Sequence, residues 1–335
     1  MLSIKNGAWF ESADERGFTH LAEYCIQRLI IDACNAAGID NTTFTVRGDT
    51  GADRVRFTVF CLPEDIEKIA EIVRVNAEQP NFTKRGIREE MRLLRGDYLD
   101  SFRNSYFRAQ CVLAPLYTKK NPSVFGSALF HLFARGSNAE ALFAYWKKFW
   151  ESSARDVLVF GAQLPETSAQ ALSRDIPAPL KSFSVQDHTA VSTRRFHGVF
   201  WREECASPLY TLLVRVMGDR ADAAERGTKM LIADRGEWRM QIIIGGSSKL
   251  EKWNTVFVKD VTQEEWTAAK EDFAECMKNI LIGDDLEDDI SNWDDCTPAV
   301  YGQFGITSLL ELVEYVEKST FEEFEKYWSA TIKTV

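Results

Sequence analysis

The chain has 335 residues, of which 45% are apolar and 12% aromatic, so it can bury the cores of two domains of about 150 residues each. Its formal net charge of −10 argues against the basic surface that phosphate binding requires, and we expect no nucleic-acid partner. No stretch reaches the roughly 18 uninterrupted apolar residues of a membrane span, and the first residues lack a signal-peptide pattern, so we expect no membrane partner.

The cysteines are scattered and form no C-x-x-C pair. An odd number of unpaired cysteines is typical of reduced thiols, so we expect a cytoplasmic protein without a cysteine zinc site. The seven are Cys25, Cys34, Cys61, Cys111, Cys205, Cys276 and Cys296.

The first 164 residues show apolar patterns of strands and helices in an α+β order. A short strand within residues 2–10 is followed by a helix at 18–37, whose apolar residues recur at helical spacing. Further expected elements are antiparallel strands at 42–47 and 54–61 around a turn at 48–53, helices at 63–76, 83–108 and 138–151, and a strand at 156–161. We therefore predict an N-terminal domain at residues 1–164.

Residues 165–182 contain Pro165, Pro177 and Pro179 and are predicted to be a linker. A C-terminal domain at 183–335 loosely repeats the first half. Its expected elements are a strand at 190–202, helices at 207–217 and 227–234, strands at 238–244 and 254–260, and helices at 262–282, 308–315 and 320–333. The predicted fold class is α+β, with two similar domains that each contain a mostly antiparallel sheet covered by helices.

The helix expected at 18–37 begins with Thr-His-Leu-Ala-Glu-Tyr-Cys at residues 19–25. Helical residues at positions i, i+3 and i+4 lie on one side, so His20, Glu23 and Tyr24 are expected to form one polar cluster. Metal hydrolases place zinc ligands and a general base in such clusters. If Tyr24 were His, the sequence would be the inverted zincin signature His-x-x-Glu-His.

The first hundred residues resemble the pitrilysin-type (M16) metallopeptidases, whose pattern is Gly-Ser-x-x-Glu followed by Gly-x-x-His-x-x-Glu-His. The matching segments are Gly-Ala-Trp-Phe-Glu at 7–11, Gly-Phe-Thr-His-Leu-Ala-Glu at 17–23, Leu-Pro-Glu-Asp-Ile at 62–66, Arg-Glu-Glu-Met-Arg-Leu-Leu-Arg-Gly-Asp-Tyr at 88–98 and Val-Phe-Gly at 159–161. The resemblance covers essentially the whole chain, is weak after residue 180, and implies two M16-type domains.

The resemblance also implies roles at single positions. His20 corresponds to the first zinc ligand, Glu23 to the general base, and Tyr24 stands where the second ligand should be His. The third ligand, normally Glu, falls on Asp97, with Asp100 as a less direct substitute. A catalytic zinc needs three protein ligands and an open position, and tyrosine binds zinc only as a costly phenolate. We therefore expect a degenerate site without zinc in this chain, and zinc in a partner subunit.

A second family element is an Arg and Tyr pair for substrate binding, within Leu-Arg-Glu-x-x-Gly-x-x-Tyr. The best ungapped counterpart is residues 231–239, where Ile232 replaces the Arg and Arg239 the Tyr. Family members also have two strands ahead of Gly7 that this chain lacks, which implies an open sheet edge for a partner or substrate strand.

Other candidates are weaker. His188 and His197 lack a third ligand at a suitable spacing, and the acidic run at 284–289 lacks the order of a calcium loop. The aromatic residues Trp146, Phe149 and Trp150 are expected to pack in the core.

Three functions remain open. The first is a non-catalytic M16-like subunit that pairs with an intact zinc-dependent M16 subunit to form a peptide-processing chamber, a type of pair that includes enzymes removing leader peptides in natural-product biosynthesis. The second is an active zinc peptidase that uses His20, Tyr24 and Asp97 as ligands and Glu23 as base. The third is a non-proteolytic scaffold subunit.

Overall fold

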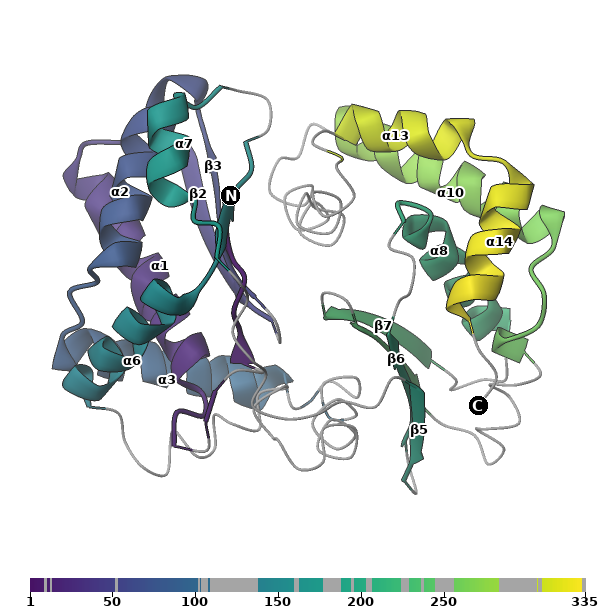
Figure 1. The fold of residues 1–335 in the computed structure, drawn as a ribbon, viewed down its shortest axis with the longest axis horizontal. Coiled ribbons are helices and arrows are strands. Elements are labelled where there is room, and N and C mark those ends of the chain that lie inside the picture. The colour runs from purple at the N-terminus through teal and green to yellow at the C-terminus, as the bar shows by residue number, and fades with distance from the viewer. Residues whose placement is uncertain are drawn as a thin grey trace. The chain divides into compact units, whose positions relative to one another are not determined.

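The structure is a computed structural model in which the chain forms two compact units, Met1–Val185 and Gln186–Val335 (Figure 1). Each unit contains a four-stranded antiparallel sheet together with helices, which confirms the α+β class. The units are described one at a time. The residues that the structure describes are 1–8, 11–12, 14–51, 54–101, 103, 108, 138–159, 163–176, 188–193, 196–202, 207–223, 229–235, 238–244, 256–282, 306 and 309–332.

The sheet of the N-terminal unit has the strand order β2-β3-β1-β4. Its strands are β1 (Leu2–Ile4), β2 (Phe44–Thr50), β3 (Val55–Cys61) and β4 (Arg155–Val157). Leu2 pairs with Phe57 on one side and with Val157 on the other, so β1 is an inner strand. The edges of the described sheet are therefore β2 and β4.

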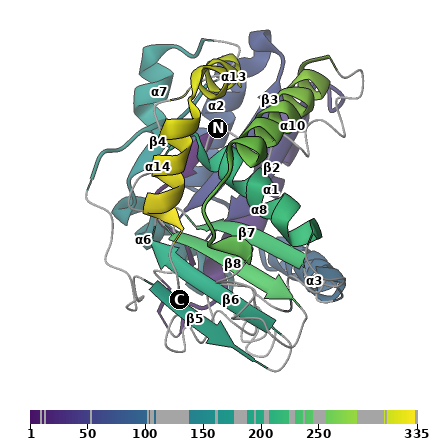
Figure 2. The ribbon, with the colours of Figure 1, turned by 90° about the vertical axis from the view of Figure 1, so that its right-hand side faces the viewer.

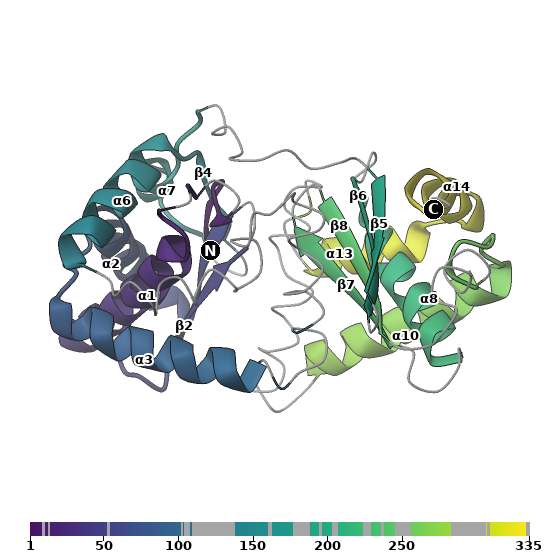
Figure 3. The same cartoon turned by 90° about the horizontal axis from the view of Figure 1, so that it is seen from below.

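The helices of this unit lie together on one face of its sheet (Figure 3). They are α1 (Phe18–Ala36), α2 (Ile66–Glu78) after the 3-10 turn η2 (Pro63–Asp65), α3 (Lys84–Ser101), α6 (Ala139–Ser152) and α7 (Glu166–Leu172). Helix α1 buries Leu21, Ile26 and Ile30 at helical spacing, and Gly38, with φ of 75°, ends it by adopting the left-handed conformation that glycine tolerates.

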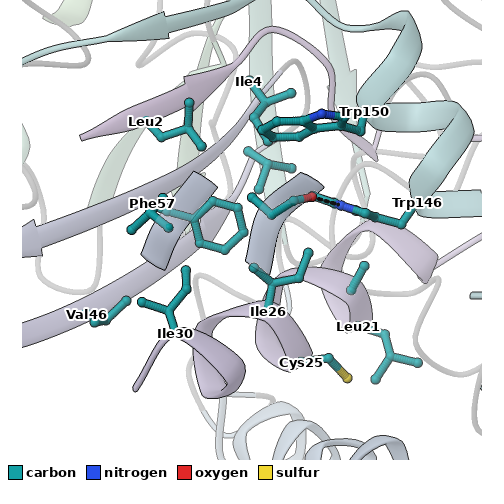
Figure 4. Packing of buried hydrophobic residues seen from close by; sticks show 14 of the residues in the cluster. Leu2, Ile4, Leu21, Cys25, Ile26, Ile30, Val46, Phe57, Trp146 and Trp150 are labelled. Carbon is teal, nitrogen blue, oxygen red and sulfur yellow. Dashed lines mark hydrogen bonds between the residues drawn. The ribbon is translucent and has the colours of Figure 1, made fainter. Parts of the chain in front are cut away.

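Trp146 lies at the centre of the N-terminal core (Figure 4). It is fully buried, its Nε1 donates a hydrogen bond of 2.6 Å to the Ala77 carbonyl, and its ring stacks on Phe149 at 4.8 Å. Phe57 from β3 meets the same ring edge-on at 6.4 Å. Trp150 is 6% exposed, so the core positions predicted for Trp146, Phe149 and Trp150 are confirmed.

Two segments of this unit differ from the expected elements. Strand β2 continues through Gly48 to Thr50, and the hairpin closes later, where the Gly51 amide donates to the Arg54 carbonyl at 2.8 Å. Within the range predicted as linker, α7 buries Leu172, and Arg174 exchanges two backbone hydrogen bonds with Arg155 at the edge of β4. Pro165 directly precedes α7, so a proline in this range marks the start of a helix as well as a possible linker.

The C-terminal unit has the strand order β5-β6-β8-β7 (Figure 2). Its elements are β5 (His188–Ser192), β6 (Phe196–Arg202), α8 (Tyr210–Ala223), β7 (Lys229–Arg235), β8 (Trp238–Ile244), α10 (Gln263–Ile282), α13 (Leu309–Lys318) and α14 (Phe321–Thr331). The helix predicted at 227–234 is wrong because β7 pairs with β8 along its whole length. The strand predicted at 254–260 is also wrong for its described part, 256–260, which contains no strand.

Both units share one local topology. In the first, β1 is followed by α1 and the hairpin β2–β3, and β1 pairs with β3. In the second, β6 is followed by α8 and the hairpin β7–β8, and β6 pairs with β8. The two halves thus repeat a strand, helix and hairpin in the same spatial order.

Arg220 of α8 organises the helical layer of the C-terminal unit. Its side chain, only 4% exposed, forms two 2.7 Å hydrogen bonds with the Glu265 carboxylate. The same guanidinium donates to the carbonyls of Phe257, Lys259 and Asp260 at 2.9–3.0 Å. It therefore joins α8, the segment before α10, and α10 itself. None of the described helices is both long and apolar enough to cross a membrane.

Candidate functional site

A buried glutamate fixes the start of α1. Gly17, at the N-cap, has φ of 86° and supplies no side-chain cap. Glu11 takes this role: its carboxylate accepts hydrogen bonds from the amides of Gly17 at 2.8 Å and Thr19 at 2.9 Å. Burial raises the pKa of Glu11 to about 7, against the lowering effect of these hydrogen bonds. The Thr19 hydroxyl hydrogen-bonds with Tyr145 at 2.5 Å, which ties this end of α1 to α6.

The polar cluster expected on α1 forms immediately after this cap. The rings of His20 and Tyr24 meet edge-on with centroids 5.1 Å apart, and Nε2 of His20 lies 3.8 Å from Oε2 of Glu23. Burial lowers the pKa of His20 to about 4, although the Asp49 and Asp97 carboxylates act in the opposite direction and 34% of the side chain is exposed. The imidazole is therefore neutral at pH 7.

Glu23 lies against β2 and is fully buried. Thr50 donates a hydrogen bond of 3.2 Å to Oε2, while the buried Oε1 has no hydrogen-bond partner among the described residues. Burial, then the nearby carboxylates of Asp49 and Glu90, raise the pKa of Glu23 well above its ordinary value, and the Thr50 hydrogen bond only partly opposes them. Burial therefore favours the protonated form of this carboxyl group, and a general base must lose that proton before it can accept another.

Gly48 makes room for this carboxyl group. A Cβ atom added at Gly48 would overlap the carboxyl group of Glu23. A glycine inside a strand often marks the close approach of another group, and here that group comes from α1. Gly48 therefore lies within β2 and not in a turn, and its role is to leave space for the Glu23 side chain.

Tyr24 and Asp97 join α1 to α3. The Tyr24 hydroxyl donates a hydrogen bond of 3.3 Å to Oδ2 of Asp97. Burial, followed by the carboxylates of Glu23 and Asp97, raises the pKa of Tyr24 above its ordinary value, so the phenol keeps its proton. Asp100, the alternative third ligand, is 72% exposed and forms an ion pair with Arg103 at 3.1 Å.

The donor set does not fit a zinc site. Zinc binds anionic or neutral donors with free lone pairs, and a catalytic site needs three of them. Tyr24 points a proton toward the carboxylate that would have to bind the metal with it. Across the described parts of the chain, no three His, Cys, Asp or Glu side chains come together as metal ligands. The structure thus brings His20, Glu23, Tyr24 and Asp97 into one neighbourhood without giving them a metal-binding arrangement.

The positions of the second family element lie on the hairpin of the C-terminal unit. Ile232 is on β7 opposite Gln241, and Arg239 is on β8 opposite Asp234. Both belong to one pair of neighbouring strands, and their role in substrate binding stays a prediction. The acidic run at 284–289 lies outside the described residues.

The sequence did not reveal three of the residues that shape the site. Gln27, Gly48 and Thr50 act through contacts between different elements, which local patterns do not encode. Glu11 ends the segment at 7–11 that resembles the family pattern, but its role as the cap of α1 was not predicted. The sequence did contain one signal for Gly48. A glycine next to a predicted strand can mark a turn, but it can also mark a place where another group packs closely against the strand.

Comparison with known proteins relates this architecture to one group of structures. No protein-family model matches the chain, and no curated protein is significantly similar to it. A protease from Helicobacter pylori aligns with a TM-score of 0.59 and 11% identity, over 99% of this chain and 90% of that one. A protein described as an M16-like peptidase from Alicyclobacillus acidocaldarius aligns with a TM-score of 0.56 and 11% identity, over 99% and 89%.

The chain has an M16-like fold. The ferredoxin protease FusC, solved in complex with Arabidopsis ferredoxin, aligns with a TM-score of 0.53 and 9% identity over 99% of this chain. This chain spans only 43% of the length of FusC. The fold implied by the sequence resemblance is thus confirmed, and at these identities the likeness concerns the fold alone.

Proposed function

We propose that the chain is a non-catalytic M16-like subunit that pairs with an intact zinc-dependent M16 subunit to form a peptide-processing chamber. The hydrogen bond from Tyr24 to Asp97 is the observation that supports this most directly. The family pattern places zinc ligands at these two positions. In this chain the Tyr24 hydroxyl instead donates its proton to the Asp97 carboxylate in a hydrogen bond. The zinc and the general base would therefore belong to the partner subunit.

The proposed ligand is a peptide in the chamber between the two subunits. FusC, which has the same fold, is a ferredoxin protease solved with ferredoxin bound, so at least one M16-like protein accepts a protein chain. The sequence resemblance adds a narrower class: leader peptides removed during natural-product biosynthesis. Scattered free cysteines, including Cys25, Cys34, Cys61 and Cys276, support a cytoplasmic location.

Metal analysis of the purified chain tests the absence of a catalytic site. We expect far less than one zinc per chain after dialysis against zinc-containing buffer, and no change on His20→Ala. The Tyr24→His variant, which restores His-x-x-Glu-His, is the matched gain-of-site control and is expected to bind more zinc than the parent. Stoichiometric zinc in the parent that is lost in His20→Ala would overturn the proposal.

Mixing experiments test the pairing. With an intact M16 subunit, we expect a heterodimer in sedimentation velocity and peptide cleavage that neither chain achieves alone. Glu23→Gln in this chain should leave that cleavage unchanged, whereas the same change at the partner's general base should abolish it. Two monomers in the mixture would contradict the pairing.

The alternative of an active zinc peptidase has one observation in its favour. His20, Tyr24 and Asp97 lie near one another on α1 and α3, as a ligand set would, with Glu23 beside them. This function requires zinc-dependent cleavage by the isolated chain that disappears in Glu23→Gln. The same assay therefore separates the two functions.

A further inference from the structure

The side chain of Gln27 is bound to the backbone of β2. Its Nε2 donates a hydrogen bond of 3.0 Å to the Val46 carbonyl, and its Oε1 accepts one of 3.2 Å from the Gly48 amide. Gln27 belongs to α1, one helical turn after Glu23, which contacts the same Gly48. Helix α1 therefore holds β2 at this glycine through two consecutive turns.

The two backbone groups that Gln27 binds face away from β3. The Gly51 amide donates to the Arg54 carbonyl at the hairpin turn, and the antiparallel register continues from there through the whole of β2. In such a ladder, every second residue bonds to the partner strand and the residues between them direct their amides and carbonyls outward. Counting back from Gly51 places Val46 and Gly48 in the outward set.

An outward carbonyl at one residue and an outward amide two residues later are the groups that a further strand would use. A carboxamide carries a donor and an acceptor, as a peptide residue of a neighbouring strand does. The Gln27 amide thus occupies the place of one strand residue at the edge of the sheet. Unprotected edges pair readily with other extended chains, and proteins cover them in several ways.

The other edge of the same sheet is covered in a related way. Arg174, after α7, exchanges two backbone hydrogen bonds of 2.8 and 3.0 Å with Arg155 of β4. Both edge strands therefore have groups of this chain bound to their outward backbone. At β2 the bound group is the side chain of Gln27, and a side chain can change its rotamer without movement of the main chain.

We propose that Gln27 closes the outer edge of β2 to strand addition, so that an extended peptide can join this sheet only when the Gln27 amide is displaced. The proposal rests on the proposed function only in taking a peptide as the excluded strand. In a paired assembly, an extended peptide would then pair with a strand edge other than that of β2.

The test uses the full chain and two variants. Gln27→Ala removes both hydrogen bonds, and Gln27→Glu keeps an acceptor for the Gly48 amide but loses the donor to Val46. Gln170→Ala is the matched control, because Gln170 donates a 2.8 Å hydrogen bond to Glu166 on exposed α7, away from β2. Circular dichroism first establishes that each variant is folded.

The probe is a fluorescein-labelled peptide that copies β3, residues 55–61 with Cys61→Ser. It suits β2 because the native pairing already matches the alternation of buried and exposed residues in these two sequences. A second peptide with Phe57→Pro lacks the amide that would bond to outward-facing Gly48 in this register and is the negative control. Fluorescence anisotropy measures binding, and hydrogen exchange measures protection of the Gly48 amide.

We expect Gln27→Ala to bind the β3 peptide roughly tenfold more tightly than the parent, since two competing hydrogen bonds are gone. Gln27→Glu should show a smaller gain, and Gln170→Ala none. Exchange of the Gly48 amide should accelerate in Gln27→Ala without peptide and slow again with it. Unchanged affinity and unchanged exchange in folded Gln27→Ala would overturn the proposal, as would equal binding of the proline peptide. Zinc content and pairing with an intact subunit do not depend on Gln27, so failure here leaves the proposed function untouched.

Discussion

The carboxyl group of Glu23 occupies the space where a side chain on Gly48 would be. The contact joins α1 to a strand of the sheet, and the fit leaves no room for one additional methyl group. Substitution at Gly48 therefore measures how tightly the site is packed.

Gly48→Ala is expected to lower the free energy of unfolding by about 2 kcal/mol, because the buried Glu23 side chain or β2 must move. Gly96→Ala in α3 is the control, since an added Cβ there meets nothing within 4 Å. Alanine is also the better helix former, so this variant should gain up to about 1 kcal/mol. Urea denaturation followed by circular dichroism measures both.

A double variant identifies the clashing partner of Gly48. In a Glu23→Ala background, the space next to Gly48 is empty and Gly48→Ala should cost much less than it does alone. An equal cost in both backgrounds would show that Glu23 is not the group displaced.

Glu11 is expected to make the protein less stable as pH rises. Burial raises its pKa from 4.5 to about 7 in the folded chain, so between these values the unfolded chain releases a proton that the folded chain keeps. This group therefore contributes most below about pH 4.5, and its contribution falls by about 3 kcal/mol by pH 7. Glu11→Gln does not titrate, so the parent should lose stability relative to Glu11→Gln over this range in urea denaturation at several pH values.

A stability difference between Glu11→Gln and the parent that stays constant with pH would contradict the raised pKa of Glu11.

Arg220→Lys is expected to destabilise the C-terminal unit by about 3 kcal/mol or more. Lysine keeps the charge but cannot reproduce the fork that binds Glu265 and the carbonyls of the preceding segment, so buried acceptors lose their donors. Hydrogen exchange by mass spectrometry should show the loss of protection in α8 and α10 and unchanged protection in α1. Arg85→Lys is the control, because Arg85 is 89% exposed in its pair with Glu89, and no measurable change is expected.

Much of the helical framework could be predicted from the sequence because its signals are local. Helix α1 was expected at 18–37 and is found at Phe18–Ala36, since its apolar period and the glycine stop lie within one segment. Helix α10, expected at 262–282, begins with another local signal, a capping box in which the Thr262 amide donates to Glu265 and the Glu265 amide donates to Thr262. Such signals need no knowledge of the rest of the chain.

The errors arose where a distant partner decides the outcome. The apolar run in β7 has no clear period, and its pairing with β8 makes it a strand. In the site, resemblance brought together His20, Glu23, Tyr24 and Asp97, but the roles of Gln27 and Gly48 depend on how α1 approaches β2. Neither residue is distinctive in sequence, because glutamine on a helix and glycine near a turn are common.

The inner position of β1 has a consequence for the order of folding. Leu2 is paired on one side with Phe57 and on the other with Val157, so β1 cannot complete its ladder until residues about 150 positions later have been synthesised. Closing so long a loop is slow, and native pairing of this sheet has to wait for α1, α2, α3 and α6 to be synthesised. A nascent chain that lacks Val157 would carry an unpaired side of β1, and unpaired strand edges make partly folded chains prone to aggregation.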